Sequence, residues 1–150
     1  EYVFRRLKNG DIVSLTGPHG EFTLREDSPH SLIFLAYGSG FAPIKSLIEH
    51  AMARDVAESM HLYWLAGKDG HYLNNLCRAW ADALDNFRYT PLEAEPAKSG
   101  AALKQVGKEH PDLAGFDVYA AGPATFLTAV KKFLRDNHFP EGQLITNRVG

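Results

Sequence analysis

The fold is decided by the stretch LIFLAYGSGFAPIKSLIEHAMAR, residues 32–54. Its first six residues, 32–37, are continuously apolar, which is typical of a strand that is covered on both faces, as in a parallel sheet. A glycine-rich turn begins at Gly38, and from about Pro43 to Arg54 apolar residues recur at helical spacing, with proline suited to a first helical turn. The stretch therefore predicts a strand, a tight turn and a helix.

The same alternation continues toward the C-terminus. Further strands are expected at residues 61–66, 87–92, 116–121 and 143–146, and further helices near residues 73–84, 101–110 and 124–137. Strands and helices that alternate in this way form βαβ crossovers. The sequence thus predicts an α/β domain with a doubly wound, parallel five-stranded sheet over residues 30–150.

The N-terminal part has a different pattern. Residues 1–7 and 12–16 are expected to be strands, joined by a turn at residues 8–11 and followed by another at residues 17–20. This antiparallel pattern ends in the polar stretch 27–30, which suits a linker. Residues 1–29 are therefore predicted to lie outside the parallel domain.

Composition excludes several classes of protein. The chain has 150 residues, 45% of them hydrophobic and 23% charged, which suits one soluble domain plus a fragment of another. A formal net charge of −2 argues against nucleic acid as a partner. The single cysteine, Cys77, allows neither an internal disulfide nor a four-cysteine iron–sulfur cluster. No apolar stretch approaches the roughly 20 residues that span a bilayer, so we expect no membrane span and a cytoplasmic protein.

The candidate site lies at the turns that follow the strands, because ligands bind beyond the carboxyl ends of a parallel sheet. Glycines in the first turn allow a close approach of the backbone to an anion, although Pro43 stands where the G-x-G-x-x-G fingerprint has its third glycine. The predicted cofactor-binding residues are Gly38, Ser39, Gly40, Phe41, Ala42, Pro43, Ala66, Gly67, Lys68, Asp69, Ala121, Gly122, Pro123 and Phe126. None of the residues in the turns at 38–43 and 121–123 is a general acid or base, and the seven histidines are scattered without metal-ligand spacing. We therefore predict no catalytic residue and no metal site.

Three motifs in order resemble the ferredoxin–NADP reductase-like flavoreductases, which include the reductase components of bacterial oxygenases. They are Gly10-Asp11 with Gly17-Pro18-His19-Gly20-Glu21-Phe22, then Gly38-Ser39-Gly40-Phe41-Ala42-Pro43, and then Ala121-Gly122-Pro123. The resemblance implies that residues 1–29 are the end of an FAD- or FMN-binding barrel and that residues 30–150 bind NADH or NADPH. It further implies hydride transfer from nicotinamide to flavin, followed by electron transfer to an iron–sulfur (2Fe-2S) centre or an oxygenase partner.

The sequence also departs from that family. Ala121 stands where the family commonly has a cysteine, and the arginine–aromatic–serine motif that anchors the flavin is absent, as expected if it lies upstream of Glu1. A nucleotide-binding or regulatory module with the same fold therefore remains the alternative. Cofactor choice is also open, because Lys68 would attract a 2′-phosphate whereas Asp69 would repel one; we lean toward NADH.

Overall fold

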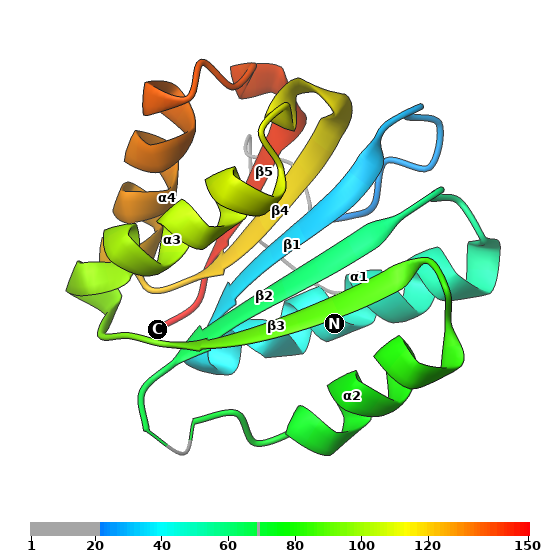
Figure 1. Cartoon of the computed structure of the whole chain (residues 1–150), viewed down its shortest axis with the longest axis horizontal. Helices are drawn as coiled ribbons and strands as arrows, with labels where there is room; N and C mark the ends of the chain where they lie inside the picture. Colours follow the sequence, from blue (N-terminus) through cyan, green and yellow to red (C-terminus); the bar gives the residue numbers. More distant parts are fainter. Residues whose placement is uncertain (1–21, 69) are drawn as a thin grey trace, which may run out of the picture.

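The predicted parallel sheet is present in the computed structural model, which describes residues 22–68 and 70–150. Its five strands are β1 (Ser31–Tyr37), β2 (Met60–Ala66), β3 (Phe87–Glu93), β4 (Phe116–Gly122) and β5 (Leu144–Arg148). They lie in the order β3-β2-β1-β4-β5, and every neighbouring pair is parallel (Figure 1). The chain thus moves outward from β1 to β3 and then returns to the other side of β1. This reversal creates a topological switch point between β1 and β4.

Four helices cover the two faces of the sheet (Figure 1). Helices α1 (Phe41–Arg54) and α2 (Asn74–Ala83) pack on one face, and α3 (Ser99–Glu109) and α4 (Ala124–Asp136) pack on the other. Side chains of β1 alternate between the two cores: Phe34 faces α1, whereas Ile33 and Leu35 face α3 and α4. The continuous apolar run of β1 is therefore explained by burial on both faces.

The boundaries of several elements differ from the sequence prediction by one or two residues, and α1 and β5 show the physical reason. Helix α1 begins at Phe41 instead of Pro43, because a 3₁₀ turn at Gly38–Gly40 leads directly into it. Pro43 is tolerated at the third helical position, where its missing N–H would have no partner within the helix. Strand β5 runs from Leu144 to Arg148, later than the predicted residues 143–146, because it pairs with β4 as far as Gly122.

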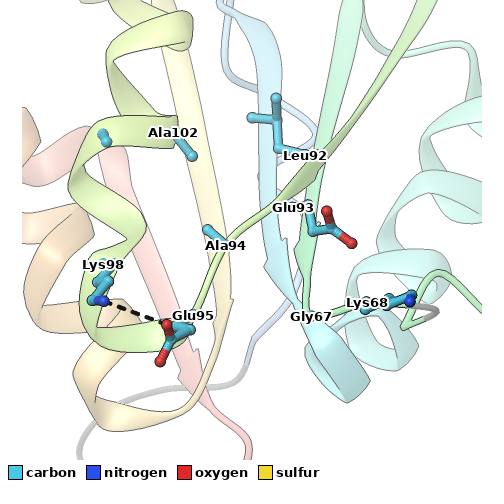
Figure 2. Close-up of a pocket in the computed structure, with 9 residues that line it drawn as sticks. Gly67, Lys68, Leu92, Glu93, Ala94, Glu95, Lys98 and Ala102 are labelled. Carbon is cyan, nitrogen blue, oxygen red and sulfur yellow. Dashed lines mark ion pairs between the residues drawn. The ribbon is translucent and has the colours of Figure 1, made fainter.

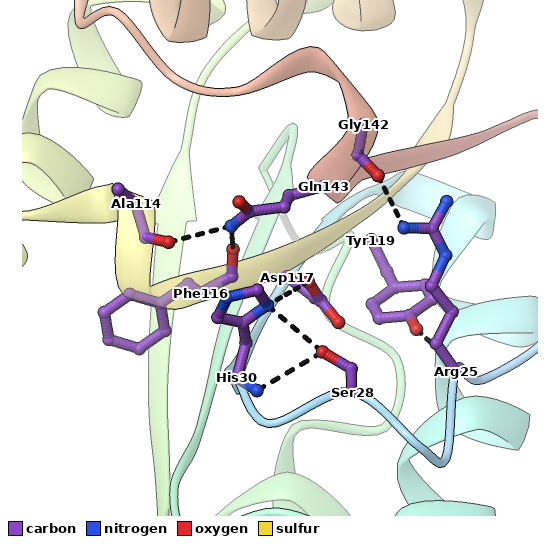
Figure 3. A network of polar contacts seen from close by, with 9 residues as sticks. All are labelled: Arg25, Ser28, His30, Ala114, Phe116, Asp117, Tyr119, Gly142 and Gln143. Atoms are coloured by element: carbon purple, nitrogen blue, oxygen red, sulfur yellow. Dashed lines mark hydrogen bonds and ion pairs between the residues drawn. The ribbon is translucent and has the colours of Figure 1, made fainter.

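The segment that precedes β1 is attached to the amino edge of the sheet (Figure 3). The backbone N–H of Arg25 donates to the Tyr119 hydroxyl at 2.8 Å, and the Arg25 guanidinium donates to the carbonyl of Gly142. Farther along, Nδ1 of His30 lies 3.0 Å from Oδ1 of the buried Asp117. These contacts join residues that are 87 or more positions apart. The strands predicted in residues 1–16 lie outside the described residues.

Within the described ranges, no helix has the length and apolar character that crossing a bilayer requires. Two side chains of the core are notable for their chemistry. Trp64 is fully buried in the core, and Cys77 is a packed side chain of α2. Burial raises the pKa of the Cys77 thiol to about 12, so this group is not a thiolate at neutral pH.

Candidate functional site

The turns after β1 and β4 meet at the switch point. Strands β1 and β4 are neighbours, and Ala36 is paired with Ala121. A Cβ atom added to Gly40 would lie 2.6 Å from the carbonyl carbon of Ala121 and 3.0 Å from the Cα of Gly122. Because no side chain fits between these backbones, Gly40 lets the two turns touch. The two glycine turns therefore lie side by side at one edge of the sheet.

The first turn combines an open backbone with the start of a helix. Gly38 has a φ of +57°, and a Cβ placed there would meet nothing within 4 Å. Ser39 and Ala42 are exposed, whereas Gly40 and Phe41 are buried. The first turn of α1 carries no acidic residue and no side-chain cap, so the positive end of its dipole is open to an anion.

In the second turn, Gly122 packs against two aromatic residues. A Cβ on Gly122 would lie 2.7 Å from Cδ2 of Phe126 and 3.0 Å from Cβ of Tyr37. The rings of Tyr37 and Phe126 are themselves in contact, with centroids 5.6 Å apart. Phe126 is fully buried, so its ring supports Gly122 and does not face the solvent. Helix α4 begins immediately after, at Ala124.

A pocket of about 560 Å³ lies beyond the carboxyl ends of β2 and β3 (Figure 2). Its lining consists of Gly67, Lys68, Leu92, Glu93, Ala94, Glu95, Lys98, Ala101 and Ala102. Figure 2 shows Glu95 paired with Lys98 on one side, at 3.5 Å, and Lys68 on the other. The floor of the pocket is apolar and the rim is charged, which suits a ligand with a flat ring and polar substituents.

Of the residues predicted in the turn after β2, Gly67 and Lys68 line this pocket. Ala66 is buried, and its carbonyl accepts a hydrogen bond from the N–H of Ala94 at 3.1 Å. Asp69 lies outside the described residues. The turn after β3 was missed in the sequence, although its pattern Glu93-Ala94-Glu95 follows a strand whose end lies at the same edge.

Tyr37 connects the pocket to the two glycine turns, and sequence reasoning did not identify it. Its hydroxyl donates to the carbonyl of Ala94, while its ring lies beside Gly122 and Phe126. Loss of solvent raises the pKa of Tyr37, and the nearby Glu95 carboxylate raises it further. Tyr37 is therefore a neutral hydrogen-bond donor at physiological pH.

The described residues do not gather a metal-binding cluster: no group of three or more His, Cys, Asp and Glu side chains is placed to hold an ion. Tyr72 is the large hydrophobic side chain that stands out by exposure, at 56%. It lies edge-on to Trp64, beside the first turn. The edge of the sheet thus offers backbone amides, small residues and aromatic rings, the means of holding a ligand by shape and by its anionic groups.

Comparisons with known proteins agree with this arrangement. The model of the oxidoreductase NAD-binding domain family matches residues 34–132. A CDP-6-deoxy-L-threo-D-glycero-4-hexulose-3-dehydrase reductase of Yersinia pestis is 28% identical, and the match covers 97% of this chain and 45% of the relative. The reductase component of propane 2-monooxygenase of Rhodococcus jostii is 27% identical, over 93% of this chain and 40% of the relative.

Among solved structures, a ferredoxin NADP⁺ reductase of Neisseria gonorrhoeae with bound FAD and NADP has a TM-score of 0.70 at 18% identity. That match covers 86% of this chain and 60% of the other. The chain spans less than half the length of the two curated relatives named above, from Yersinia pestis and Rhodococcus jostii. With its family model, topology and paired glycine turns in agreement, the chain belongs to the oxidoreductase NAD-binding domain family, within the ferredoxin–NADP reductase-like flavoreductases.

Proposed function

We propose that residues 30–150 bind the pyridine nucleotide of a flavin-dependent electron-transfer reductase and that residues 1–29 belong to its FAD- or FMN-binding barrel. The observation that carries the proposal is the contact between the Gly38–Gly40 turn and Ala121-Gly122 at the switch point. A dinucleotide needs two such open backbone positions, one at its pyrophosphate and one at its nicotinamide. When bound, the nicotinamide supplies a hydride to the flavin, which passes electrons on singly.

The residues of the site act by binding and orienting. Gly38, Ser39 and the positive end of the α1 dipole hold the pyrophosphate, where the backbone is open and the helix dipole favours negative charge. Gly122 and Pro123 lie against the nicotinamide. Tyr37 and Phe126 pack against Gly122 and hold its backbone in place, so that the surface facing the nicotinamide is backbone and not a mobile side chain.

The adenosine end occupies the pocket beyond β2 and β3, and there the charges favour NADH over NADPH. Glu93 and Glu95 line the pocket, and their carboxylates accept hydrogen bonds from a free ribose diol but repel a 2′-phosphate. Lys98 is paired with Glu95, which reduces the attraction of this cation for a phosphate. Lys68, on the opposite side, is the remaining cation of the pocket lining.

The electron acceptor is an iron–sulfur (2Fe-2S) protein or an oxygenase component. This part of the proposal is supported by the Rhodococcus jostii relative, which is the reductase component of a propane 2-monooxygenase. The rival function is a nucleotide-binding module that transfers no electrons, favoured by the absence of a thiol at Ala121. Absorbance of the full-length protein separates the two: a bound yellow flavin that bleaches on addition of NADH supports the reductase, and a colourless protein that binds NADH supports the module.

The binding site itself is tested with a charge in the first turn. Ser39→Glu places a carboxylate at the anion site, where it competes with the pyrophosphate, while a negative charge near a helix N-terminus does not destabilise the fold. We expect NADH affinity, measured by calorimetry, to fall by at least tenfold. Ser46→Glu, an equally exposed change farther along α1, serves as the matched control and should leave the affinity within twofold.

NADPH is titrated into the same proteins. The wild type should bind NADH more tightly than NADPH, because the pocket carries the two glutamates. Equal NADH affinity in the Ser39 and Ser46 variants would contradict the proposal that the first turn binds the pyrophosphate. Tighter binding of NADPH than of NADH would remove the proposed cofactor preference alone.

A further inference from the structure

Trp64 reaches from β2 to the first glycine turn. It is fully buried, and its indole N–H donates to the carbonyl of Gly38 at 3.1 Å. The same carbonyl also accepts the backbone N–H of Phe41, which closes the 3₁₀ turn. Both acceptor positions of this oxygen are therefore used, and the direction of the Gly38 peptide is fixed.

The ring of Trp64 also holds the other end of the turn. It stacks on Phe41, the first residue of α1, with centroids 4.0 Å apart and an interplanar angle of 14°. One side chain thus contacts Gly38 through a hydrogen bond and Phe41 through ring packing. Ser39, between these anchors, is exposed, and a Cβ on Gly38 would meet nothing within 4 Å.

The main chain of Trp64 also makes a contact outside the first turn. Its carbonyl lies 2.7 Å from Nε2 of His71, in the loop that follows β2. Trp64 therefore joins the turn after β1 to the loop after β2 at one point of the sheet edge. Packing alone does not require an indole here, because a phenyl ring would also stack on Phe41, so the N–H is the distinguishing group.

We infer that Trp64 is a positioning residue for the dinucleotide site: its indole N–H presets the Gly38–Phe41 turn in the conformation that receives the pyrophosphate. This inference rests on the proposed function. A turn that is already ordered loses less conformational entropy on binding than a turn that the ligand must order. Without the N–H, the Gly38 carbonyl turns toward water and the turn loses its single conformation.

The test compares Trp64→Phe with Trp80→Phe in the full chain. Trp80 is the other tryptophan; it packs near Phe41 and Phe87 from α2, so its substitution also changes the packing around Phe41 but leaves the hydrogen bond from Trp64 to Gly38 in place. Loss of one hydrogen bond that orders the turn should raise the Kd for NADH about fivefold in W64F. We expect W80F to stay within twofold of the wild type, although thermal melting should show that both variants are destabilised.

An equal NADH affinity in W64F and W80F would overturn the role of Trp64 and leave the proposed function standing. No NADH binding by the wild type would overturn both. If W64F does not fold, the W80F protein is made with 3-benzothienylalanine, which has the shape of tryptophan without the N–H, in place of Trp64. The same fivefold loss relative to W80F supports the inference, and an unchanged Kd overturns it.

Discussion

At the scale of single residues, Gly40 carries a constraint that is independent of any ligand. A methyl group at this position would press on the backbone of Ala121, which cannot rotate away as a side chain can. We expect Gly40→Ala to lower the free energy of unfolding by about 1–3 kcal/mol, the usual cost of overpacking. Urea denaturation, followed by circular dichroism, measures the free energy of unfolding of this variant and of the wild type.

Gly100→Ala is the matched control for this prediction. Gly100 lies in α3, and a Cβ there would meet nothing within 4 Å. Because alanine is the better helix former, this variant should be as stable as the wild type or more stable, by up to about 1 kcal/mol. If Gly40→Ala were equally harmless, the close approach of the two turns would be contradicted. The constraint also explains why Ser39, and not Gly40, is the informative position for testing phosphate binding.

At the scale of elements, the sequence predicted the five strands and four α-helices that the structure describes, because each carries a local signal. The apolar run of β1 and the helical spacing of α1 need no information from elsewhere in the chain. The roles of Trp64 and Tyr37 could not be found in this way, because their partners Gly38 and Ala94 lie 26 and 57 positions away. Phe126 is close to the second turn in sequence, but its burial beneath Gly122 follows from the packing of α4.

The segment before β1 is held on the sheet in part by the hydrogen bond between Arg25 and Tyr119. Tyr119→Phe removes the hydroxyl that accepts the N–H of Arg25 and keeps the ring, which stacks on Phe34. Loss of one hydrogen bond should make local opening of this segment about fivefold more frequent. Trypsin should therefore cleave after Arg25 about fivefold faster, as measured by mass spectrometry.

Tyr89→Phe provides the comparison for this measurement. It removes a hydroxyl that donates to Asn74, far from the segment, and should leave cleavage after Arg25 unchanged. Equal rates in the two variants would show that the Tyr119 contact does not hold the segment on the sheet.

At the scale of the whole molecule, the two faces of the sheet differ in their response to acid. The α3 face contains a buried polar cluster in which Nδ1 of His61 lies 2.9 Å from Nε2 of His110. Nε2 of His61 lies 2.8 Å from the Thr90 hydroxyl, and the Tyr63 hydroxyl donates to Glu109. His61 is 2% exposed, so its imidazole is buried as the neutral form. Protonation would place a charge in the interior and within the field of the positive charges of Arg88 and His110.

Burial, together with the positive charges of Arg88 and His110, lowers the pKa of His61 from 6.5 to about 3, against a smaller opposing effect of Glu109. Because the unfolded chain binds this proton near pH 6.5 and the folded chain does not, stability is complete above pH 6.5 and is lost as the pH falls toward 3. His110 acts in the same direction, since burial lowers its pKa as well. The free energy of unfolding should thus fall by about 2 kcal/mol between pH 7.5 and pH 5.0 from His61 alone.

Urea denaturation at these two pH values measures the loss, in a range that lies above the ordinary pKa of the carboxylates. His61→Asn should show less than half of the wild-type difference between pH 7.5 and 5.0. His138→Asn should keep the whole difference, because His138 is exposed and asparagine tolerates its φ of 59°. A wild-type stability that is flat over this range would mean that the His61–His110 cluster opens to water, and that the contact between the end of α3 and the sheet is not maintained in solution.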